Sequence, residues 1–400
     1  MPSNNPIKVF YPFPEDPRVH RARTIQALNT AASLAKAGAE VALFLDGKKE
    51  GFEELLSSYY GIHKPQNLHV EFSSREKVIM GVLPIRSNRL FNSRFLRVAK
   101  GLASPPDAIF CRHLKTAEFL LKKRPFRGVP VVFEAHDIFH LSFQEENNLR
   151  CFRNRMKHNR LKRRETFVLN SAGSVISITS HLLKRMRDES GVGFPENIAP
   201  DGTAFAGLFE EKKLDLSDNR IFYIGSFQPW KGVNLLIEAL KYPGMGELVL
   251  VGPMNGKEKE ELSLISKRLG VLNKVSFRGP VAPSGISSLL KEVNFVAVPN
   301  GNDLRSRLFT SPLKLFDYMA AGAAIIASDH PSIREVLGEE KIGWAKPGDP
   351  SSIAGAYRRL KENQGETIKT SLSLKKKAME YSWDRRGERI LEILSNLCAR

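Results

Sequence analysis

The sequence predicts an α/β protein with two doubly wound, Rossmann-like domains. Short runs rich in Val, Ile and Phe alternate with helical segments, which is typical of parallel sheets covered on both faces. This alternation is interrupted over residues 200–219, where polar residues, Gly and Pro accumulate, and then it starts again. The chain has 400 residues, more than one hydrophobic core usually supports, which also favours two domains.

The expected strands form two series, one on either side of that interruption. The first lies at 7–13, 40–46, 68–73, 107–111, 129–137 and 173–180, and the second at 220–226, 246–252, 274–279, 294–300 and 323–328. Helices are expected between them, for example up to Ala37 and over 257–270. We therefore predict domains at 1–205 and 206–380 that face each other across a cleft, where such folds bind ligands. An amphipathic helix at about 381–400 fits packing on either domain.

The composition is that of an ordinary soluble globular protein, with 42% hydrophobic and 26% charged residues. No apolar run approaches the roughly 20 residues that span a bilayer, and the N-terminus lacks the layout of a signal peptide. The three cysteines have no metal-binding spacing and fit a reducing compartment. These observations predict a cytoplasmic protein without a metal site.

The net charge is +18, and most of the excess lies in the first 200 residues. This indicates an anionic partner for the first domain, such as acidic lipid, nucleic acid or a phosphorylated substrate. Two segments, 86–100 and 149–165, mix Lys and Arg with large apolar residues, which predicts peripheral association with the inner face of an anionic membrane. Solvated helices are the alternative for both. A specific nucleic-acid binder is a weaker interpretation, because no recognition motif is present.

Two strand-to-helix junctions of the second domain place a lysine near free backbone N–H groups. Lys231 is expected to begin one helix, and Lys314 lies in the first turn of another, with Ser311 as its N-cap and Pro312 at its first position. A cation in a first turn is unfavourable unless an anion binds there, so the two junctions together predict a diphosphate site. The alternative for Lys314 is a side chain that reaches solvent or pairs with Asp317.

Neighbouring residues suit a nucleotide. Gly225 ends a strand and lets the backbone approach a ligand, and Asp317 offers a carboxylate to ribose hydroxyls. The Gly-x-Gly-x-x-Gly pattern after a strand and the Walker Gly-Lys-Ser/Thr pattern are both absent. Neither nicotinamide nor P-loop chemistry is therefore supported.

In the first domain, polar residues follow two strands. His136 and Asp137 end a buried run, at the edge where parallel sheets bind ligands. No serine or cysteine elbow accompanies them, so hydrolysis is not supported. Arg18 and Arg21 follow the first strand and are candidates for contact with an anionic acceptor, with a solvated helix face as the alternative.

Five segments carry a family resemblance: FEAHDIF (133–139), IAPDGTAFAGLF (198–209), FYIGSFQPWKGVNLLIEAL (222–240), VSFRGPV (275–281) and TSPLKLFDYMAAGAAIIASDHPSIREVL (310–337). They resemble the GT-B glycosyltransferases, in particular the large retaining family 4. The resemblance implies a retaining glycosyltransferase, of the hexosyltransferase type, with no obligatory metal or other cofactor. Its donor would be a UDP- or GDP-linked sugar, and its acceptor a glycolipid, polysaccharide or related saccharide.

The resemblance also assigns roles to matching positions. Lys231 would contact the donor diphosphate, Asp317 the ribose, and His136 the transferred sugar. The other residues implied in donor binding are Gly225, Ser226, Gly279, Val281, Thr310, Ser311, Leu313 and Lys314, with Gly279 and Val281 beside the base.

The chain departs from the family at two positions of that site. Ser226 stands where an Arg usually pairs with Lys231, and Phe309 replaces the first Glu of a Glu-x7-Glu pattern that ends here in Asp317. We hypothesise that Arg305 or Arg307 supplies the missing positive charge on the leaving diphosphate. The same losses fit a catalytically silent relative that acts as a partner subunit, and this alternative stays open.

Overall fold

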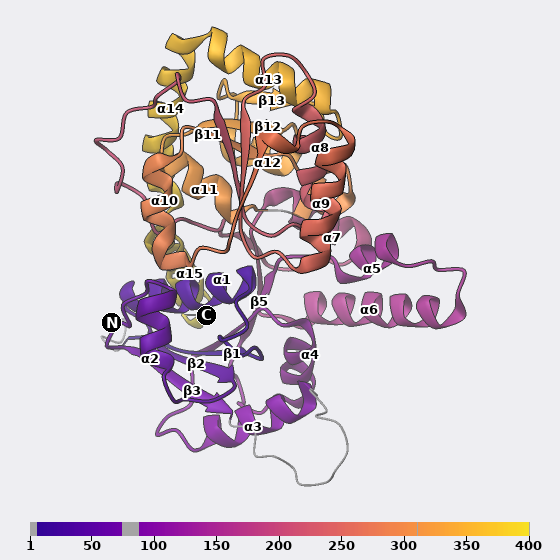
Figure 1. Ribbon diagram of the computed structural model, residues 1–400. Helices are drawn as coiled ribbons and strands as arrows, with labels where there is room; N and C mark the ends of the chain where they lie inside the picture. The colour runs from indigo at the N-terminus through magenta and orange to yellow at the C-terminus, as the bar shows by residue number, and fades with distance from the viewer. Residues whose placement is uncertain (1–5, 74–87, 310, 400) are drawn as a thin grey trace. The chain divides into compact units, whose positions relative to one another are not determined.

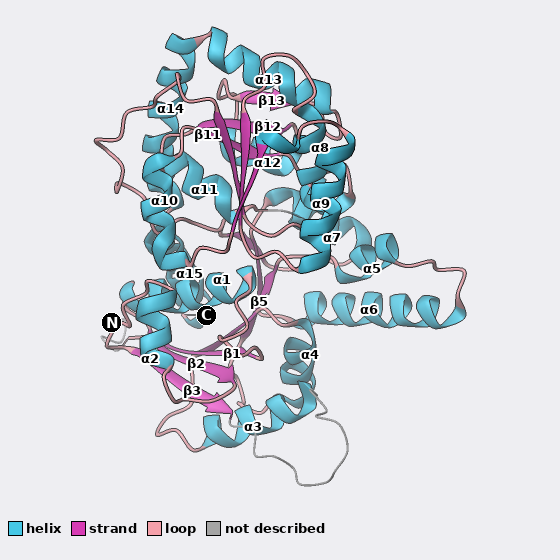
Figure 2. Cartoon of the chain, in the orientation of Figure 1, coloured by secondary structure: helices cyan, strands magenta, loops and turns pink. Residues whose placement is uncertain are grey.

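The computed structural model describes residues 6–73, 88–309 and 311–399, in two compact units (Figure 1). Unit 1 comprises Met1–Pro200 and Trp383–Arg400, and unit 2 comprises Asp201–Ser382. The domains expected from the sequence divide at 205/206 and near 380. Each unit is a parallel sheet with helices on both of its faces (Figure 2).

Unit 1 contains a sheet of seven parallel strands in the order β3-β2-β1-β4-β5-β6-β7. Its strands are β1 (Lys8–Phe13), β2 (Glu40–Asp46), β3 (Leu68–Ser73), β4 (Ala108–Cys111), β5 (Val131–Ala135), β6 (Ser174–Ser177) and β7 (Glu196–Ile198). Its helices are α1 (Ala22–Lys36), α2 (Phe52–Glu54, continued by a π-helical turn, Leu55–Tyr59), α3 (Asn88–Lys100), α4 (Leu114–Lys123), α5 (Phe139–Glu146), α6 (Phe152–Ser171), α7 (Ser180–Ser190) and α15 (Trp383–Cys398).

Unit 2 contains a sheet of six parallel strands in the order β10-β9-β8-β11-β12-β13, the doubly wound order of dinucleotide-binding folds. Its strands are β8 (Arg220–Ile224), β9 (Glu247–Val251), β10 (Val275–Arg278), β11 (Phe295–Val298), β12 (Ala324–Ser328) and β13 (Gly343–Ala345). Its helices are α8 (Val233–Ala239), α9 (Gly256–Arg268), α10 (Ile286–Glu292), α11 (Leu313–Ala320), α12 (Pro331–Leu337), α13 (Pro350–Glu362) and α14 (Gln364–Ala378).

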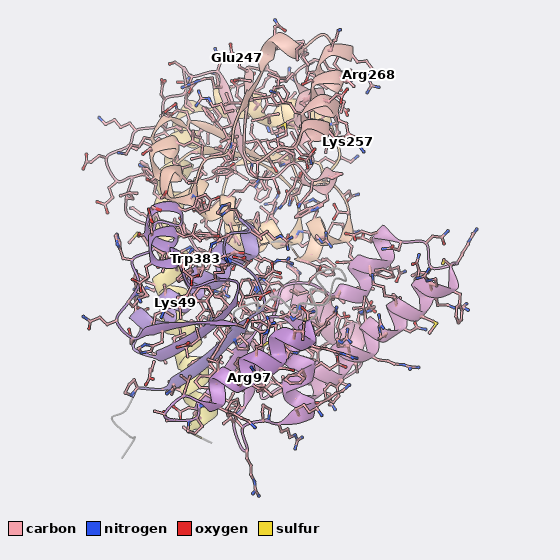
Figure 3. The ribbon with its side chains drawn as sticks, turned by 60° about the horizontal axis from the view of Figure 1, so that its bottom comes forward. Lys49, Arg97, Glu247, Lys257, Arg268 and Trp383 are labelled. Atoms are coloured by element: carbon pink, nitrogen blue, oxygen red, sulfur yellow. The ribbon has the colours of Figure 1, made fainter. Side chains whose placement is uncertain are left out.

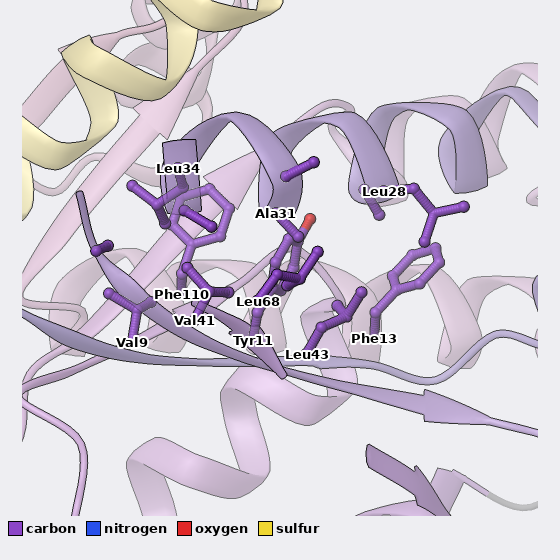
Figure 4. Packing of buried hydrophobic residues seen from close by; sticks show 14 of the residues in the cluster. Val9, Tyr11, Phe13, Leu28, Ala31, Leu34, Val41, Leu43, Leu68 and Phe110 are labelled. Atoms are coloured by element: carbon purple, nitrogen blue, oxygen red, sulfur yellow. The ribbon is translucent and has the colours of Figure 1, made fainter. Parts of the chain in front are cut away.

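The core of unit 1 forms where the apolar face of the sheet packs against the apolar face of helix α1. Every second residue of β1 and β2 points to one face of the sheet, and α1 lays an apolar stripe on that face (Figure 4). The side chains that interlock there include Val9, Tyr11, Phe13, Leu28, Ala31, Leu34, Val41 and Leu43. The rigid sheet fixes the strand ends that carry polar residues.

The C-terminal helix α15 belongs to unit 1. Its residues Ile390 and Leu394 join the same core. Gly387 lets α15 approach α1 closely, because a Cβ atom there would lie 2.3 Å from the carbonyl oxygen of Ser33. The amphipathic pattern fitted packing on either unit, and this backbone contact identifies the one that α15 covers.

The segment 86–100 was expected to offer an apolar face to a membrane. Within its described part, α3, the rings of Phe91 and Phe95 are buried, and Phe95 packs edge-on against Phe44 of β2. These aromatic side chains therefore serve the core of unit 1, and of the expected apolar residues Leu90 is the one that is largely exposed.

Candidate functional site

Unit 2 gathers cations on aromatic rings at the carboxyl edge of its sheet. Lys231 ends a 3₁₀ turn, Pro229–Lys231, and its Nζ lies 3.7 Å from the ring centroid of Trp230. The guanidinium carbon of Arg305 lies 5.7 Å from the same ring. The expected helix start at Lys231 is corrected: α8 begins two residues later, after Gly232, which has φ +69°. Ring faces hold these cations by cation–π attraction.

Lys314 is held in the same manner from the second junction. Its Nζ lies 3.5 Å from the ring centroid of Tyr223, on β8. This nitrogen is buried and has no hydrogen-bond partner among the described residues. Gly225 provides the space: it has φ +145°, and a Cβ there would lie 2.9 Å from Lys314 Nζ. Gly225 thus lets the side chain of Lys314 approach the backbone closely.

Burial and neighbouring positive charges lower the pKa of both lysines. The pKa of Lys231 is lowered to about 7, chiefly by burial and then by Arg305, with a small opposing effect of Asp303. Burial, and then the charge of Lys231, holds the pKa of Lys314 well below its usual value. Neither lysine forms an ion pair with a carboxylate of the described residues. Two half-buried lysines that form no ion pair within the described residues are typical of an anion-binding site.

Lys314 does not pair with Asp317 in the structure, so that alternative is wrong. The Oδ1 atom of Asp317 accepts a hydrogen bond of 2.7 Å from the Thr203 hydroxyl. Burial raises the pKa of Asp317 to about 7, against a smaller opposite effect of that hydrogen bond. The second carboxylate oxygen carries no hydrogen bond within the described residues, so it is available to a ribose hydroxyl.

The start of α11 differs from the expected cap. Pro312 occupies the N-cap position rather than the first helical one, and no side chain caps the helix. The Ser311 hydroxyl is buried and has no hydrogen-bond partner among the described residues. Leu313 and Lys314 are the first two helical residues, whose N–H groups an α-helix leaves without internal partners. Thr310 lies outside the described residues. The junction therefore offers amide and hydroxyl donors beside Lys314.

The two candidate arginines lie on a π-helical turn, Arg305–Phe309, and differ in surroundings. Arg305 is close enough to Lys231 to lower its pKa, whereas Arg307 is exposed and lies near His330. Phe309 is buried in the place where the family has an acid. Of the two arginines, Arg305 is the one beside the lysine pair.

The remaining donor-side candidates lie elsewhere along the same sheet. Ser226 follows Gly225, and its carbonyl oxygen accepts a hydrogen bond of 2.6 Å from the Tyr223 hydroxyl. Gly279 and Val281 are exposed in the segment after β10, an edge strand two positions from β8. Their role beside a base stays a prediction.

In unit 1, His136 belongs to a buried cluster centred on a carboxylate that the sequence analysis did not identify. His136 Nε2 lies 3.1 Å from Glu134 Oε2, and Glu134 also pairs with Arg386 of α15 and, at 4.0 Å, with Arg112. Burial alone would raise the pKa of Glu134, but His136, Arg386 and Arg112 hold it well below its usual value. Glu134 is therefore ionised and orients one nitrogen of His136.

Arg386 fixes this cluster to the end of unit 1. Its guanidinium donates hydrogen bonds to the carbonyl oxygens of Ala199 and Pro200 as well as to Glu134. One signal of this cluster was present in the sequence, since an acid inside the apolar run of β5 needs a buried partner. The sequence did not identify that partner, because 252 positions separate Glu134 from Arg386.

The acceptor-side candidates are engaged within unit 1. Arg18 donates hydrogen bonds to the carbonyl oxygens of Lys48 and Glu50, so its guanidinium fixes the segment after β2. Arg21 pairs with Glu15 at 3.2 Å. Asp137 accepts a hydrogen bond from the Ser142 hydroxyl in the first turn of α5. Their contact with an acceptor stays a prediction.

Among the described residues, no group of three or more His, Cys, Asp or Glu side chains is placed to hold a metal ion. No described helix combines the length and apolar character that crossing a bilayer requires.

Two Rossmann-like sheets, one of which carries a cation site at its carboxyl edge, define a transferase of the GT-B class. Residues 24–200 match the family described as "Glycosyl transferase 4-like domain", and residues 206–381 match "Glycosyl transferases group 1". The chain belongs to the GT-B glycosyltransferases of the family 4-like kind, and it is a glycosyltransferase.

Curated relatives match over part of the chain. A D-inositol 3-phosphate glycosyltransferase of Xylanimonas cellulosilytica is 23% identical over 52% of this chain and 49% of its own length. A phosphatidyl-myo-inositol mannosyltransferase of Mycobacterium leprae is 29% identical over 36% of this chain and 37% of its own. The chain thus matches half or less of the length of these relatives.

Solved structures match over nearly the whole chain. Sucrose-phosphate synthase from Thermosynechococcus elongatus has a TM-score of 0.76 and 15% identity, and covers 98% of this chain and 99% of its own. Anabaena HepE in complex with UDP-glucose has a TM-score of 0.70 and 18% identity, and covers 98% and 100%. At these identities the likeness establishes the fold.

Proposed function

We propose that this glycosyltransferase moves a hexose from a UDP-linked donor to a lipid-linked or saccharide acceptor, with retention at the anomeric carbon. A GDP-linked donor is the alternative. HepE, of the same fold, is described in complex with UDP and with UDP-glucose, which supports the uridine nucleotide. The name of the mycobacterial relative includes a phosphatidylinositol acceptor, which supports a lipid-linked one. Retention and independence of a metal rest on the family resemblance.

The observation that carries the donor part is the lysine pair. Lys231 and Lys314 lie close enough for the charge of Lys231 to lower the pKa of Lys314, yet neither forms an ion pair with a carboxylate of the described residues. Asp303 is near enough to raise the pKa of Lys231, but it does not pair with it. A diphosphate would supply the missing charge and accept the hydrogen bonds that the aromatic rings cannot accept. The same cations, with Arg305, would stabilise the charge that develops on the diphosphate as the glycosidic bond breaks.

Other residues take the roles that their chemistry allows. Asp317 would bind the ribose through its second carboxylate oxygen, and Ser311 would donate its buried hydroxyl to phosphate or sugar. His136, oriented by the ionised Glu134, would contact the transferred sugar with its other ring nitrogen. The acceptor would bind mainly to unit 1.

Thermal-shift screening with UDP, GDP and their sugars tests the donor. A ligand at 100 times its dissociation constant stabilises the folded chain by about 2.7 kcal/mol, so the correct nucleotide is identified by its shift. The Lys231→Met/Lys314→Met variant is expected to lose that shift. An equal shift in this variant would refute the diphosphate site. The configuration at the anomeric carbon of an isolated product, read by NMR, then tests retention.

A second candidate, a catalytically silent partner subunit, is favoured by Phe309 and Ser226. Phe309 is fully apolar and buried, so it offers nothing to a sugar hydroxyl. A chain that binds the nucleotide sugar but releases no nucleotide with any saccharide or lipid-linked acceptor would support this second function over the first.

A further inference from the structure

Helix α6 extends outward from the sheet of unit 1, and the connection from α5 lies at its outer end (Figure 2). Its position is fixed by Glu165, which accepts hydrogen bonds from the backbone N–H groups of Phe139 and His140 at 2.6 and 3.1 Å and from His140 Nδ1 at 2.6 Å. Glu165 thereby caps the first turn of α5. The α5–α6 pair is anchored at its inner end and exposed at its outer one.

A groove of ≈ 700 Å³ lies beside α6, on the side of α4. Its lining is dominated by cations, which are Lys122, Arg153, Lys157, Arg160, Arg163 and Arg164. Glu118 is the one acid in this lining, and it is already paired with Lys122 at 2.8 Å and with Arg164. Within the described residues, no carboxylate pairs with Arg153, Arg160 or Arg163. The groove therefore carries a large uncompensated positive charge.

Burial and the positive charge of the groove lower the pKa of a neighbouring lysine. The pKa of Lys115, at the start of α4, is lowered by burial and then by Arg164, Arg160 and Lys157. Repulsion of this kind is relieved when an anion binds between the cations.

Large apolar side chains accompany the cations on α6. Phe152 and Met156 are 64% and 58% exposed, and Met156 also lines the groove. Exposed apolar side chains flanked by Lys and Arg are typical of helices that lie in the interface of an anionic bilayer. A nucleic-acid surface would instead be expected to offer base-edge donors and stacking rings along a channel.

We propose that the groove between α4 and α6 binds the phosphate groups of anionic phospholipids, and that Phe152 and Met156 enter the lipid interface beside it. The purpose of this site rests on the proposed function. Binding there would hold the chain at the membrane surface, where a lipid-linked acceptor lies. The binding itself requires no donor.

The experiment is co-sedimentation with vesicles of phosphatidylcholine alone or with phosphatidylglycerol, at low and high salt. The test variant is Arg153→Gln/Arg160→Gln/Arg163→Gln, since Gln keeps helix propensity while removing charge. The matched control removes three exposed cations of α9 in unit 2, Lys257→Gln/Lys259→Gln/Arg268→Gln. Figure 3 labels Lys257 and Arg268. Circular dichroism and the donor thermal shift establish that both variants are folded.

The unaltered chain should bind the anionic vesicles, and the α6 variant should bind them on the order of 100-fold more weakly, since each of the three removed cations contributes about 1 kcal/mol, roughly a factor of five, near a membrane. The α9 control should bind as the unaltered chain does. Phe152→Ser/Met156→Ser should weaken binding at high salt as well as at low salt. The donor shift should stay unchanged in every variant, which separates this proposal from the proposed donor site.

Three results would overturn the proposal. The first is equal pelleting with neutral and anionic vesicles. The second is an equal loss in the α6 and α9 variants, which would mean a general effect of net charge. The third is release from vesicles by glycerol phosphate at the concentration of the lipid phosphate, or preference for an oligonucleotide, which would assign the groove to a free phosphate or to nucleic acid.

Discussion

The two buried charge clusters of this glycosyltransferase differ in their balance. In unit 1, Glu134 is surrounded by His136, Arg112 and Arg386, so its charge is matched by neighbours of opposite sign. In unit 2, Lys231 and Lys314 oppose each other and have aromatic rings beneath them instead of carboxylates. A cluster with balanced charges stabilises the fold. A cluster with unbalanced charges destabilises the free protein, and binding of a ligand with the opposite charge removes that destabilisation.

The largest expected effect comes from breaking the balanced cluster. Arg386→Ala leaves Glu134 buried without its guanidinium partner on α15 and should lower the free energy of unfolding by about 3–5 kcal/mol. Urea denaturation measures the change. Arg385→Ala is the matched control, because Arg385 is exposed and pairs with Glu388 one turn along α15, so its loss should cost about 0.5 kcal/mol or less. Equal losses in the two variants would remove the distinction between the clusters.

Next in size is the removal of a charge from the unbalanced cluster. Lys314→Met should weaken binding of a UDP-sugar by about 1.5–3 kcal/mol, roughly 10- to 150-fold, because a charge-assisted hydrogen bond is lost. The stability of the free chain should stay unchanged or rise, since a buried unpaired ammonium group is removed. Calorimetry and urea denaturation give the two quantities. Lys341→Met, at an exposed position of unit 2, should change neither the affinity for the UDP-sugar nor the free energy of unfolding greatly. A destabilised Lys314→Met variant with unimpaired donor binding would contradict the assignment.

The pH dependence of donor binding sharpens the comparison further. Lys231 has its pKa lowered to about 7 in the free chain, and a bound diphosphate should raise it. Below pH 7 the ammonium group is already present, whereas above pH 7 binding must take up a proton. Affinity should therefore fall by up to tenfold per pH unit above 7. Calorimetry in buffers of different ionisation enthalpy should find about one more proton taken up at pH 8 than at pH 6.

Lys231→Arg is the control for that experiment, because a guanidinium stays charged across this range. The variant should bind with a flatter pH profile and with less proton uptake at pH 8. A profile as steep as that of the unaltered chain would locate the titrating group elsewhere.

The smallest expected effect concerns Asp317, an acid without a cation. Its folded-state pKa is raised to about 7, so the folded chain holds a proton that the unfolded chain has already lost. Stability from this group is present below the unfolded pKa near 4 and is lost as the pH rises towards 7. Asp317→Asn should therefore stabilise the chain at pH 8 and leave its stability unchanged at pH 4. Urea denaturation at the two pH values tests this, and a stabilisation that is equal at both would exclude an ionising Asp317.

Local periods in the sequence predicted most of the sheets. The strands from β1 to β6 and from β8 to β12 fall within the expected ranges, because alternation and flanking turn residues are properties of short segments. The strands β7 and β13 were missed, since three residues at a sheet edge are too few to display a period. The membrane interpretation of 86–100 failed at Phe91 and Phe95 for a related reason: an apolar stripe does not tell which surface will cover it.

The sequence by itself determined two parallel α/β units and the junctions that carry Lys231 and Lys314, because strand periods, turn residues and helix starts are encoded within a few positions of one another. Tertiary structure alone decided what surrounds each charge. Arg386 reaches Glu134 across 252 positions, and the rings of Tyr223 and Trp230 lie beneath lysines that pair with no carboxylate in the part of the chain that the structure describes. Charge compensation depends on which distant segments pack together, and that packing is the outcome of the whole fold.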